Sequence, residues 1–460
     1  MAELDQKDYH KLDAPLSEIL SSMKLKDDER KEANKYLIEI IENEVIPAMQ
    51  DVDEFFKIVY KRLTPSGSYY ENLKISKPNE FDRNVELAIP FKDIEVRSSS
   101  FYGYVQVKCN GDKKRFAEKG EKILKNWLDS DGMLKRNEVL QWMQSVMDRA
   151  LCKKPIENVK IFPSRHGPAI TLTIIVKSSS GKELEFCVDL VPVFSFDEAH
   201  WPKPPVRQPF INLPDFPKTW CIVPKEVPNN PEETTHWRIS FYDQERRLMN
   251  GYNAMKAILK LIKKLRDCQN NCDYLSSYYI KTVFLWEMEK EKYSEEFWQK
   301  SIGVLFIDML KRLVEYIKEK QCIPFFWDER HNLISKLEQD TFKNLGNRIE
   351  NIINKIEKNL PGNPDYVKSC FPGWDTEDPS SSSSVAQSFS EEIKSDSDTE
   401  ILSDNFSSLF SDNYPRLRQR QAQDHSLEDI GIWGAIGIGA LALALGVTAV
   451  IRGIQENNRQ

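Results

Sequence analysis

The sequence predicts an α+β protein with two lobes, a mixed β-sheet lobe followed by a helical lobe. Short runs of β-branched and apolar residues recur between about residues 80 and 190, whereas apolar residues recur at helical spacing from about residue 238 to residue 358. The 460-residue chain is 40% apolar and includes 23 Phe, 16 Tyr and 10 Trp. That is ample material for a core, and it excludes a wholly disordered or fibrous chain.

A long amphipathic helix is expected near the start of the first lobe. Between residues 26 and 50 apolar side chains recur mostly at three- and four-residue steps, and the pattern continues to Val59. This indicates one long spine or two helices in succession, ended by the run Thr64-Pro65-Ser66-Gly67-Ser68. The other elements expected here are strands over residues 80–89, 102–108, 170–176 and 184–190 and a helix over residues 136–151.

The second lobe is expected to be helical. Residues 195–231 are rich in Pro and aromatic residues, which indicates a long ordered connection over a surface. Helices are then expected over residues 245–267, 275–289, 295–318 and 329–358. We therefore place the sheet lobe with its spine helix in residues 1–225 and the helical lobe in residues 226–374.

The composition changes sharply after Phe371. Residues 375–429 contain five consecutive serines and carry 13 acidic and four basic residues, a composition typical of a disordered acidic linker. Residues 430–451 then form a 22-residue run without a charge, followed by a short tail, residues 452–460. A helix of that length spans about 33 Å, close to the ~30 Å of a bilayer core. We expect a membrane span that anchors a cytosolic chain to an intracellular membrane, with a buried core helix as the alternative.

Charge and cysteine usage restrict the partners and the compartment. The formal net charge is −7, and because the acidic linker accounts for this excess, residues 1–374 are close to neutral. A polyanion partner must therefore use a local basic patch. The first 20 residues are largely polar and do not resemble a secretory signal. We therefore expect the eight cysteines to be reduced thiols in the cytosol. Cys268 and Cys272 have no second pair at zinc spacing, so no zinc site is expected.

Three carboxylates are the candidates for chemistry. Glu80 and Asp82 are two residues apart, so on a strand both point to one face. Asp189 lies in an apolar strand, where a charge must be paired, metal-bound or exposed. Three carboxylates on adjacent strands suit two Mg²⁺ or Mn²⁺ ions, and the turn at Gly67-Ser68 could offer N–H groups to phosphate. The alternative is that each acid is simply a solvated strand residue.

The runs Gly67-Ser68-Tyr69-Tyr70 and Pro78-Asn79-Glu80-Phe81-Asp82 closely resemble cyclic GMP–AMP synthase and the cyclic GMP–AMP synthase-like receptors, which are nucleotidyltransferases of the male-abnormal (Mab) family. Later matches follow in the same order, and the resemblance spans roughly residues 15–360. These matches are Val188-Asp189, Trp201-Pro202, Trp237-Arg238-Ile239-Ser240-Phe241, Glu245, Lys256 at 21 residues before Ser277, Ser276-Ser277-Tyr278 and Lys281-Thr282.

The resemblance implies a bilobal nucleotidyltransferase fold and a set of site residues. Glu80, Asp82 and Asp189 would hold the two metal ions, and Asp189 could also act as general base. The implied nucleotide-binding residues are Gly67, Ser68, Arg238, Ser240, Glu245, Lys256, Ser277 and Tyr278. Among them Lys256 and Ser277 would orient a triphosphate, Tyr278 would stack on a base and Arg238 would contact the acceptor nucleotide. Without the resemblance, Lys256 would be assigned to a solvated helix face and Tyr278 to the core.

The implied activity is nucleic-acid-activated synthesis of a cyclic dinucleotide, cyclic GMP–AMP from ATP and GTP, for a STING-type receptor of innate immunity. The zinc ribbon of cyclic GMP–AMP synthase is absent between Glu245 and Lys256, which favours double-stranded RNA over double-stranded DNA. The candidate RNA-binding side chains are Lys24, Lys26, Arg30, Lys31, Lys35, Lys260, Lys263 and Lys264, and a solvated charged face is the alternative for each of them.

Two other functions remain open at this stage. The membrane segment departs from typical soluble relatives, so the chain could be a catalytically inactive, membrane-anchored nucleotide-binding adaptor of the same family. The full set of three acids argues against that reading. An enzyme that extends RNA ends would use the same metals, and only its product would distinguish it.

Overall fold

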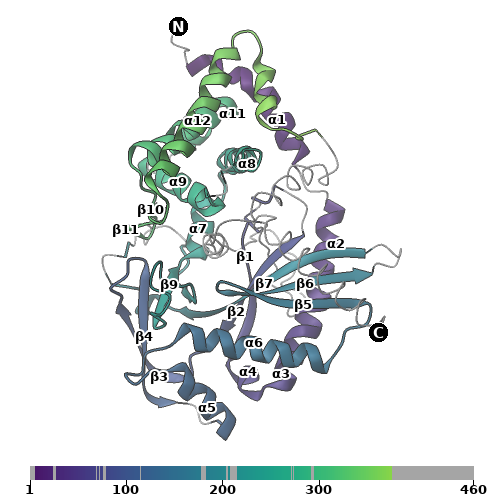
Figure 1. Cartoon of the computed structure of the whole chain (residues 1–460), viewed down its shortest axis with the longest axis vertical. Coiled ribbons are helices and arrows are strands. Elements are labelled where there is room, and N and C mark those ends of the chain that lie inside the picture. Colours follow the sequence, from purple (N-terminus) through teal and green to yellow (C-terminus); the bar gives the residue numbers. More distant parts are fainter. Residues whose placement is uncertain are drawn as a thin grey trace, which may run out of the picture.

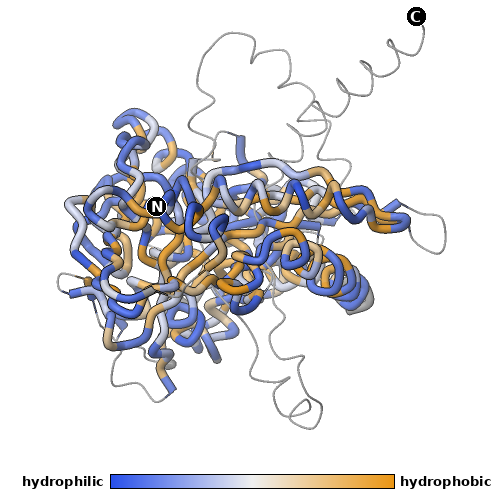
Figure 2. Tube along the Cα trace, turned by 90° about the horizontal axis from the view of Figure 1, so that it is seen from below, coloured by the Kyte–Doolittle hydropathy of each residue, from blue (hydrophilic) through white to orange (hydrophobic). Residues whose placement is uncertain are grey.

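Two lobes follow one another along the long axis of the molecule, a sheet lobe and a helical lobe (Figure 1). The computed structural model describes residues 6–23, 27–68, 70–71, 73–75, 79–113, 116–177, 183–203, 206–207, 215–270, 272, 274–291 and 295–375. Seen along the long axis, apolar segments gather toward the middle of the molecule and many hydrophilic ones lie at its periphery (Figure 2). The α+β class, with a mixed sheet and a helical second half, is confirmed.

Nine of the described strands form one sheet. Along its main path the order is β1-β2-β7-β8-β9-β4-β3, and β6 pairs with both β7 and β5. The strands are β1 (Tyr60–Ser66), β2 (Glu80–Leu87), β3 (Phe91–Ser98), β4 (Tyr104–Lys113), β5 (Val159–His166), β6 (Ala169–Lys177), β7 (Glu183–Phe196), β8 (Trp220–Val223) and β9 (His236–Ser240).

The long strand β7 organises the sheet. Its first part pairs antiparallel with β6, its last residues pair antiparallel with β8, and β2 runs parallel along its other side. The adjacent residues Leu190 and Val191 point to opposite faces and are both buried, as expected for a central strand covered on both faces. Strands β2 and β7 lie far apart in sequence, so their parallel pairing is set by the tertiary structure and not by local sequence.

The spine predicted over residues 26–59 is a succession of helices. It comprises α2 (Asp27–Leu37), a π-helical segment (Ile38–Val45), α3 (Ile46–Val52) and α4 (Glu54–Val59). Pro47 lacks an N–H and cannot extend an α-helical hydrogen-bond ladder back into the preceding turn, which accounts for the wider π turn before it. At Asp53 the backbone is extended, and the carboxylate caps α4 by accepting from Phe56 N at 2.9 Å.

The remaining helices divide between the lobes (Figure 1). Helices α5 (Glu118–Trp127) and α6 (Arg136–Lys153) lie with α3 and α4 at the end of the sheet lobe, away from the helical lobe. The first segments, a 3₁₀ turn (Gln6–Leu12) and α1 (Asp13–Ser22), lie with the helical lobe. That lobe contains α7 (Tyr242–Met249), α8 (Asn253–Asp267), α9 (Ser277–Lys290), α10 (Glu295–Trp298), α11 (Ile302–Val314), a π segment (Glu315–Glu319), α12 (Gln339–Asn359) and a 3₁₀ segment (Pro364–Cys370).

Three predictions for the chain after residue 195 were wrong in part, in addition to the helix expected over 295–318, which is divided between α10 and α11. The connection over residues 195–231 contains a buried strand, β8, in which Trp220 and Ile222 are fully buried. The helix expected over 245–267 is broken between α7 and α8, where Gly251 adopts a left-handed φ of 93° that ends a helix.

The third error concerns residues 329–338. Instead of a helix, the chain forms a hairpin of β10 (Pro324–Phe325) and β11 (Asp328–Asn332), and α12 begins ten residues later than predicted. The Asp328 carboxylate accepts from Gly103 N at 2.9 Å, so a contact with the sheet lobe overrides the local helical pattern.

Strands β1, β3, β5 and β9 and helices α1 and α5 were not predicted. The acidic linker, the apolar segment 430–451 and the tail lie outside the described residues. Among the residues that are described, no helix combines the length and apolarity needed to cross a membrane.

Candidate active site

Two aspartates face each other across parallel strands at the centre of the site. The register pairs Asp82 on β2 directly with Asp189 on β7, and the two residues are only 9% and 8% exposed. Glu80 lies two residues before Asp82 and therefore on the same face of β2. The next strand position, Arg83, faces the other way and pairs with Glu42 of the spine at 3.2 Å. The predicted acids are thus brought together on one face.

The aspartate pair is electrostatically strained. Burial raises the pKa of Asp82 well above its ordinary value, and the neighbouring Asp189 and Glu80 raise it further. Burial also raises the pKa of Asp189 to about 6, against the opposing hydrogen bond from Thr171. Two carboxylates this close repel each other when both are ionised, which favours a proton between them. A cation placed between them would replace that proton.

Lys74 is a site residue that the sequence reasoning missed. Its ammonium group, 5% exposed, pairs with Glu80 Oε2 at 3.0 Å and also lowers the pKa of Asp82. In the described part of the chain no three His, Cys, Asp or Glu side chains are grouped closely enough to hold a metal ion. Asp82 and Asp189 nevertheless fit a divalent cation, because they are hard oxygen ligands held side by side in a buried place. Glu80 would join them by exchanging Lys74 for the metal.

The Gly67-Ser68 turn lies beside these acids. It directly follows β1, whose last residue, Ser66, pairs with Asp82 across the sheet. Gly67 adopts a left-handed φ of 101°, which favours glycine, and its carbonyl accepts from Tyr70 N and Glu71 N at 3.0 Å. The turn is thus a tight bend beside the acidic pair, and its role in binding phosphate stays a prediction.

Glu245 is the centre of a buried network between the lobes. It lies on α7, is 3% exposed and accepts from Trp327 Nε1 at 2.9 Å and from the Tyr278 hydroxyl at 3.0 Å. Lys281 on α9 bridges Glu245 at 2.8 Å and Glu71 at 2.5 Å. This network links the segment after the Gly67-Ser68 turn to helices α7 and α9.

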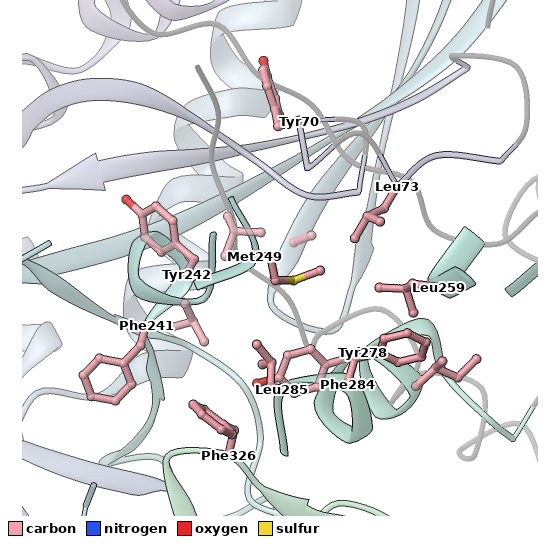
Figure 3. Close-up of a cluster of buried hydrophobic side chains, with 14 of the residues drawn as sticks. Tyr70, Leu73, Phe241, Tyr242, Met249, Leu259, Tyr278, Phe284, Leu285 and Phe326 are labelled. Carbon is pink, nitrogen blue, oxygen red and sulfur yellow. The ribbon is translucent and has the colours of Figure 1, made fainter. Parts of the chain in front are cut away.

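Tyr278 is buried in this structure. Its ring is 4% exposed and lies among apolar side chains that include Phe284 and Leu285 of the same helix (Figure 3). Burial and the neighbouring Glu245 raise the pKa of its hydroxyl well above the ordinary value. Stacking on a base therefore requires the ring to become exposed, and its predicted role stays a prediction.

The predicted phosphate contacts are half-buried at the same interface. Ser277 is the first residue of α9, and Lys256 is in the first turn of α8. Burial lowers the pKa of Lys256, Lys281 and Arg246 lower it further, and Glu71 opposes them. Lys256 therefore lies within the electrostatic reach of the Glu71–Lys281 pair.

Arg238 and Ser240 lie on β9, which β8 separates from β7. They are 8% and 7% exposed. The Arg238 guanidinium lies 3.9 Å from the ring centre of Phe325 and 5.5 Å from that of Tyr104. Its charge acts on the Tyr278 hydroxyl, so it belongs to the interlobe part of the site rather than to the aspartate pair.

One predicted RNA-binding residue is not on the surface. Lys263 is 4% exposed and donates to the Leu73 carbonyl at 2.8 Å, because the inner face of α8 packs against the segment after β1. Lys260 and Lys264 are half-buried, and Lys31 and Lys35 are exposed on α2. Lys24 and Lys26 lie outside the described residues, as does the side chain of Arg30.

Comparison with known proteins gives matches over most of the described chain. The model described as Mab-21 protein nucleotidyltransferase domain matches residues 69–251, and the one described as Mab-21 protein HhH/H2TH-like domain matches residues 254–351. The two matches meet at the break between α7 and α8.

Three relatives illustrate the similarity. A cyclic GMP–AMP synthase-like receptor of Trichogramma pretiosum is 34% identical over 355 residues, which cover 73% of this chain and 70% of the relative. One of Ctenocephalides felis is 34% identical over 389 residues, covering 78% and 87%. A cyclic GMP–AMP synthase-like protein of Drosophila melanogaster is 26% identical over 326 residues, covering 71% and 88%.

Proposed function

The chain belongs to the Mab-21 nucleotidyltransferases and, within them, to the cyclic GMP–AMP synthase-like receptors, and from this premise we propose that it makes a cyclic dinucleotide when a nucleic acid activates it. It is a nucleotidyltransferase. The observation that carries the proposal is the buried, directly paired Asp82 and Asp189 with Glu80 on the same face. An adaptor without catalysis has no need to bury carboxylates that repel one another.

The roles of the residues follow from their positions. Glu80, Asp82 and Asp189 would hold two Mg²⁺ or Mn²⁺ ions, which supply charge stabilisation at the triphosphate and lower the pKa of the attacking hydroxyl. A ribose hydroxyl oxygen of one nucleotide forms a bond to the α-phosphorus of another, Asp189 takes the hydroxyl proton, and pyrophosphate leaves. A second such step closes the ring.

The other site residues bind and orient the nucleotides. The N–H groups of the Gly67-Ser68 turn and the side chains of Lys256 and Ser277 would hold the triphosphate. Arg238, Ser240, Glu245 and Tyr278 would hold the acceptor and its base. These four residues lie in the buried network between the lobes, which must open to admit a nucleotide. The activating ligand would favour this opening.

We assign ATP and GTP as substrates, cyclic GMP–AMP as product and double-stranded RNA as activator, with a STING-type receptor for the product. The similarity to the cyclic GMP–AMP synthase-like receptors supports this assignment. The exposed Lys31 and Lys35 on α2 offer charges suited to phosphates along an A-form helix.

Residues 430–451 are proposed to anchor the cytosolic catalytic part to an intracellular membrane. An anchored chain stays with membranes in alkaline carbonate and is released only by detergent. Release by carbonate alone would contradict the anchor without touching the catalytic proposal.

The test uses the full-length chain with labelled ATP, GTP, CTP and UTP and with Mg²⁺ or Mn²⁺. Double-stranded RNA, double-stranded DNA or no nucleic acid is added, and the products are resolved. With RNA we expect a phosphatase-resistant product. Asp82→Asn should lower the rate of its formation by at least ~100-fold, because the substitution removes a carboxylate ligand of the metal ions that stabilise charge in the transition state. Glu185→Gln, an exposed carboxylate on the same strand face as Asp189, is the matched control and keeps its activity.

The other outcomes would overturn the proposed product, the proposed catalysis or the proposed activator. A linear product that grows on an RNA end assigns RNA-end extension. Nucleotide binding without any product, in a folded protein, assigns the membrane-anchored adaptor. Activation by DNA and not by RNA keeps the enzyme and replaces its activator.

A further inference from the structure

One row of the sheet carries a hydroxyl or carboxyl group on each of five adjacent strands. The register pairs Ser164 with Thr171, Thr171 with Asp189, Asp189 with Asp82, and Asp82 with Ser66. Partners directly opposite each other in a sheet point to the same face. The row therefore places the Thr171 hydroxyl immediately beside the aspartate pair, on the side opposite Ser66.

Thr171 is committed to Asp189. Its hydroxyl donates to Asp189 Oδ1, and the residue is only 4% exposed. A threonine hydroxyl has a single hydrogen, so every other polar neighbour of this oxygen must donate to it. The Thr171 hydroxyl thus donates to Asp189 and can only accept hydrogen bonds from its other neighbours.

His166 supports this direction. Its Nδ1 lies 3.2 Å from Thr171 Oγ1, and because the threonine hydrogen is used on Asp189, Nδ1 must carry a proton and donate. The turn Gly167-Pro168 brings His166 back over β6, with Gly167 at a left-handed φ of 54°. His166, Thr171 and Asp189 therefore form a chain of hydrogen bonds that all point toward the site.

We propose that Thr171, supported by His166, is a positioning residue that orients the Asp189 carboxylate for a divalent metal ion. The terminal torsion of an aspartate is broad, so a carboxylate without a fixed partner samples many orientations. The bond to Oδ1 restricts this rotation and leaves Oδ2 for the cation shared with Asp82. This role rests on the metal site of the proposed function.

The neighbouring Thr173 supplies a matched comparison. It lies two residues along β6, on the same face, and is 5% exposed. It pairs with Cys187 across β7, and its hydroxyl lies 3.7 Å from the Cys187 sulfur rather than near a carboxylate. A valine at either position removes one buried hydroxyl, but only at Thr171 does a site carboxylate lose its donor.

The experiment measures Mn²⁺ binding to the full-length chain without nucleotide, by calorimetry and by the electron paramagnetic resonance of free Mn²⁺. We expect Thr171→Val to weaken binding ~10- to 100-fold, the range found when the partner of a metal ligand is removed. Thr171→Ser keeps the hydroxyl and should bind within a few-fold of the unchanged chain, about as tightly as Thr173→Val. With nucleotide present, Thr171→Val should lower kcat at saturating substrate and recover with excess Mn²⁺.

Several results would overturn the proposal. Equal Mn²⁺ affinity of Thr171→Val and the unchanged chain removes the orienting role, and an equal loss in Thr173→Val reduces it to a packing effect. If Thr171→Val does not fold, His166→Ala removes the supporting donor at a half-buried hairpin position and must weaken binding in the same direction. No Mn²⁺ binding by the unchanged chain overturns the proposed metal site itself, and this role with it.

Discussion

At the scale of single residues, several ionisable side chains of this fold are buried away from water. Asp82 and Asp189 are explained by the site that they form. Lys263 is not, because it lies on α8 and only donates to the Leu73 carbonyl. This hydrogen bond ties the helical lobe to the segment that carries Lys74.

The charge state of Lys263 makes stability depend on pH. Burial, helped by Arg266, lowers the pKa of Lys263 to about 7. Between that value and the ordinary lysine value, the unfolded chain binds a proton that the folded chain does not, so stability rises with pH in this window. We expect the free energy of unfolding of the unchanged chain, relative to Lys263→Met, to rise by about 1 kcal/mol per pH unit above pH 7.

Urea unfolding at pH 6.5, 8 and 9 measures this difference. Lys264→Met, at the adjacent half-buried position, controls for the loss of a lysine from α8. Parallel pH profiles for the unchanged chain and Lys263→Met would contradict the prediction.

At the scale of elements, the first residues of the chain dock on the helical lobe, and their closest approach is at a glycine of α11. Gly303, near the start of α11, donates its N–H to Asp13 Oδ1 at 2.7 Å. A Cβ at this glycine would lie 2.0 Å from the Tyr9 carbonyl oxygen. The Tyr9 hydroxyl in turn donates to Glu357 of α12 at 2.6 Å. The N-terminal segment thus docks where α11 has no side chain.

Gly303→Ala should therefore undock this segment. Alanine favours a helix by up to ~1 kcal/mol over glycine, so a net loss of stability can only come from the clash. We expect a destabilisation of about 1–3 kcal/mol by urea unfolding, with faster proteolysis before residue 23. Gly362→Ala, where a Cβ meets nothing within 4 Å, should change stability by less than about 0.5 kcal/mol. Equal effects of the two substitutions would refute the docking argument.

At the scale of the whole molecule, the two lobes are joined through buried charges as well as apolar packing. Lys281 lies between Glu71 and Glu245 and is 3% exposed. Burial alone would lower its pKa, but the two carboxylates outweigh burial and raise it, so Lys281 stays charged. A nucleotide that engaged Glu245 would have to rearrange this bridge, which couples occupancy of the site to the contact between the lobes.

Removing Lys281 should lower the stability of the protein. Lys281→Met leaves Glu71 buried without this partner, and we expect a loss of about 3–5 kcal/mol in the free energy of unfolding. Glu71→Gln in the same chain should restore part of it, with a coupling energy of about 1–3 kcal/mol in a double-mutant cycle. Additive effects of the two substitutions would mean that the pair contributes nothing as a pair.

The local patterns of the chain predicted much of the fold. Strands β2, β6 and β7 and helices α6, α9 and α11 follow from runs of β-branched residues and from helical spacing of apolar ones. Strand periodicity placed Glu80 and Asp82 on one face. The family resemblance, carried by Gly67-Ser68 and the acids, pointed to a nucleotidyltransferase before any contact was known.

Other features depended on contacts between distant segments. Residues 329–338 look helical, but Asp328 accepts a hydrogen bond from Gly103 of the sheet lobe and begins β11, the second strand of a hairpin. Lys74 was not singled out in the sequence and Lys263 was named as a candidate RNA-binding side chain, whereas the fold places them against Glu80 and the Leu73 carbonyl.

By itself, then, the sequence determined the α+β class, the strand positions of the three acids and the family. Those properties depend on local spacing and on residue identity, which any reader of the chain can see. Only the tertiary structure decided that Asp82 lies opposite Asp189, that Lys74 neutralises Glu80 and that Tyr278 is buried on Glu245. The first and the last are pairings between segments far apart in the sequence, and the Lys74–Glu80 pair forms six residues apart because the fold buries both groups, since buried charges must find partners and buried strands must share a core.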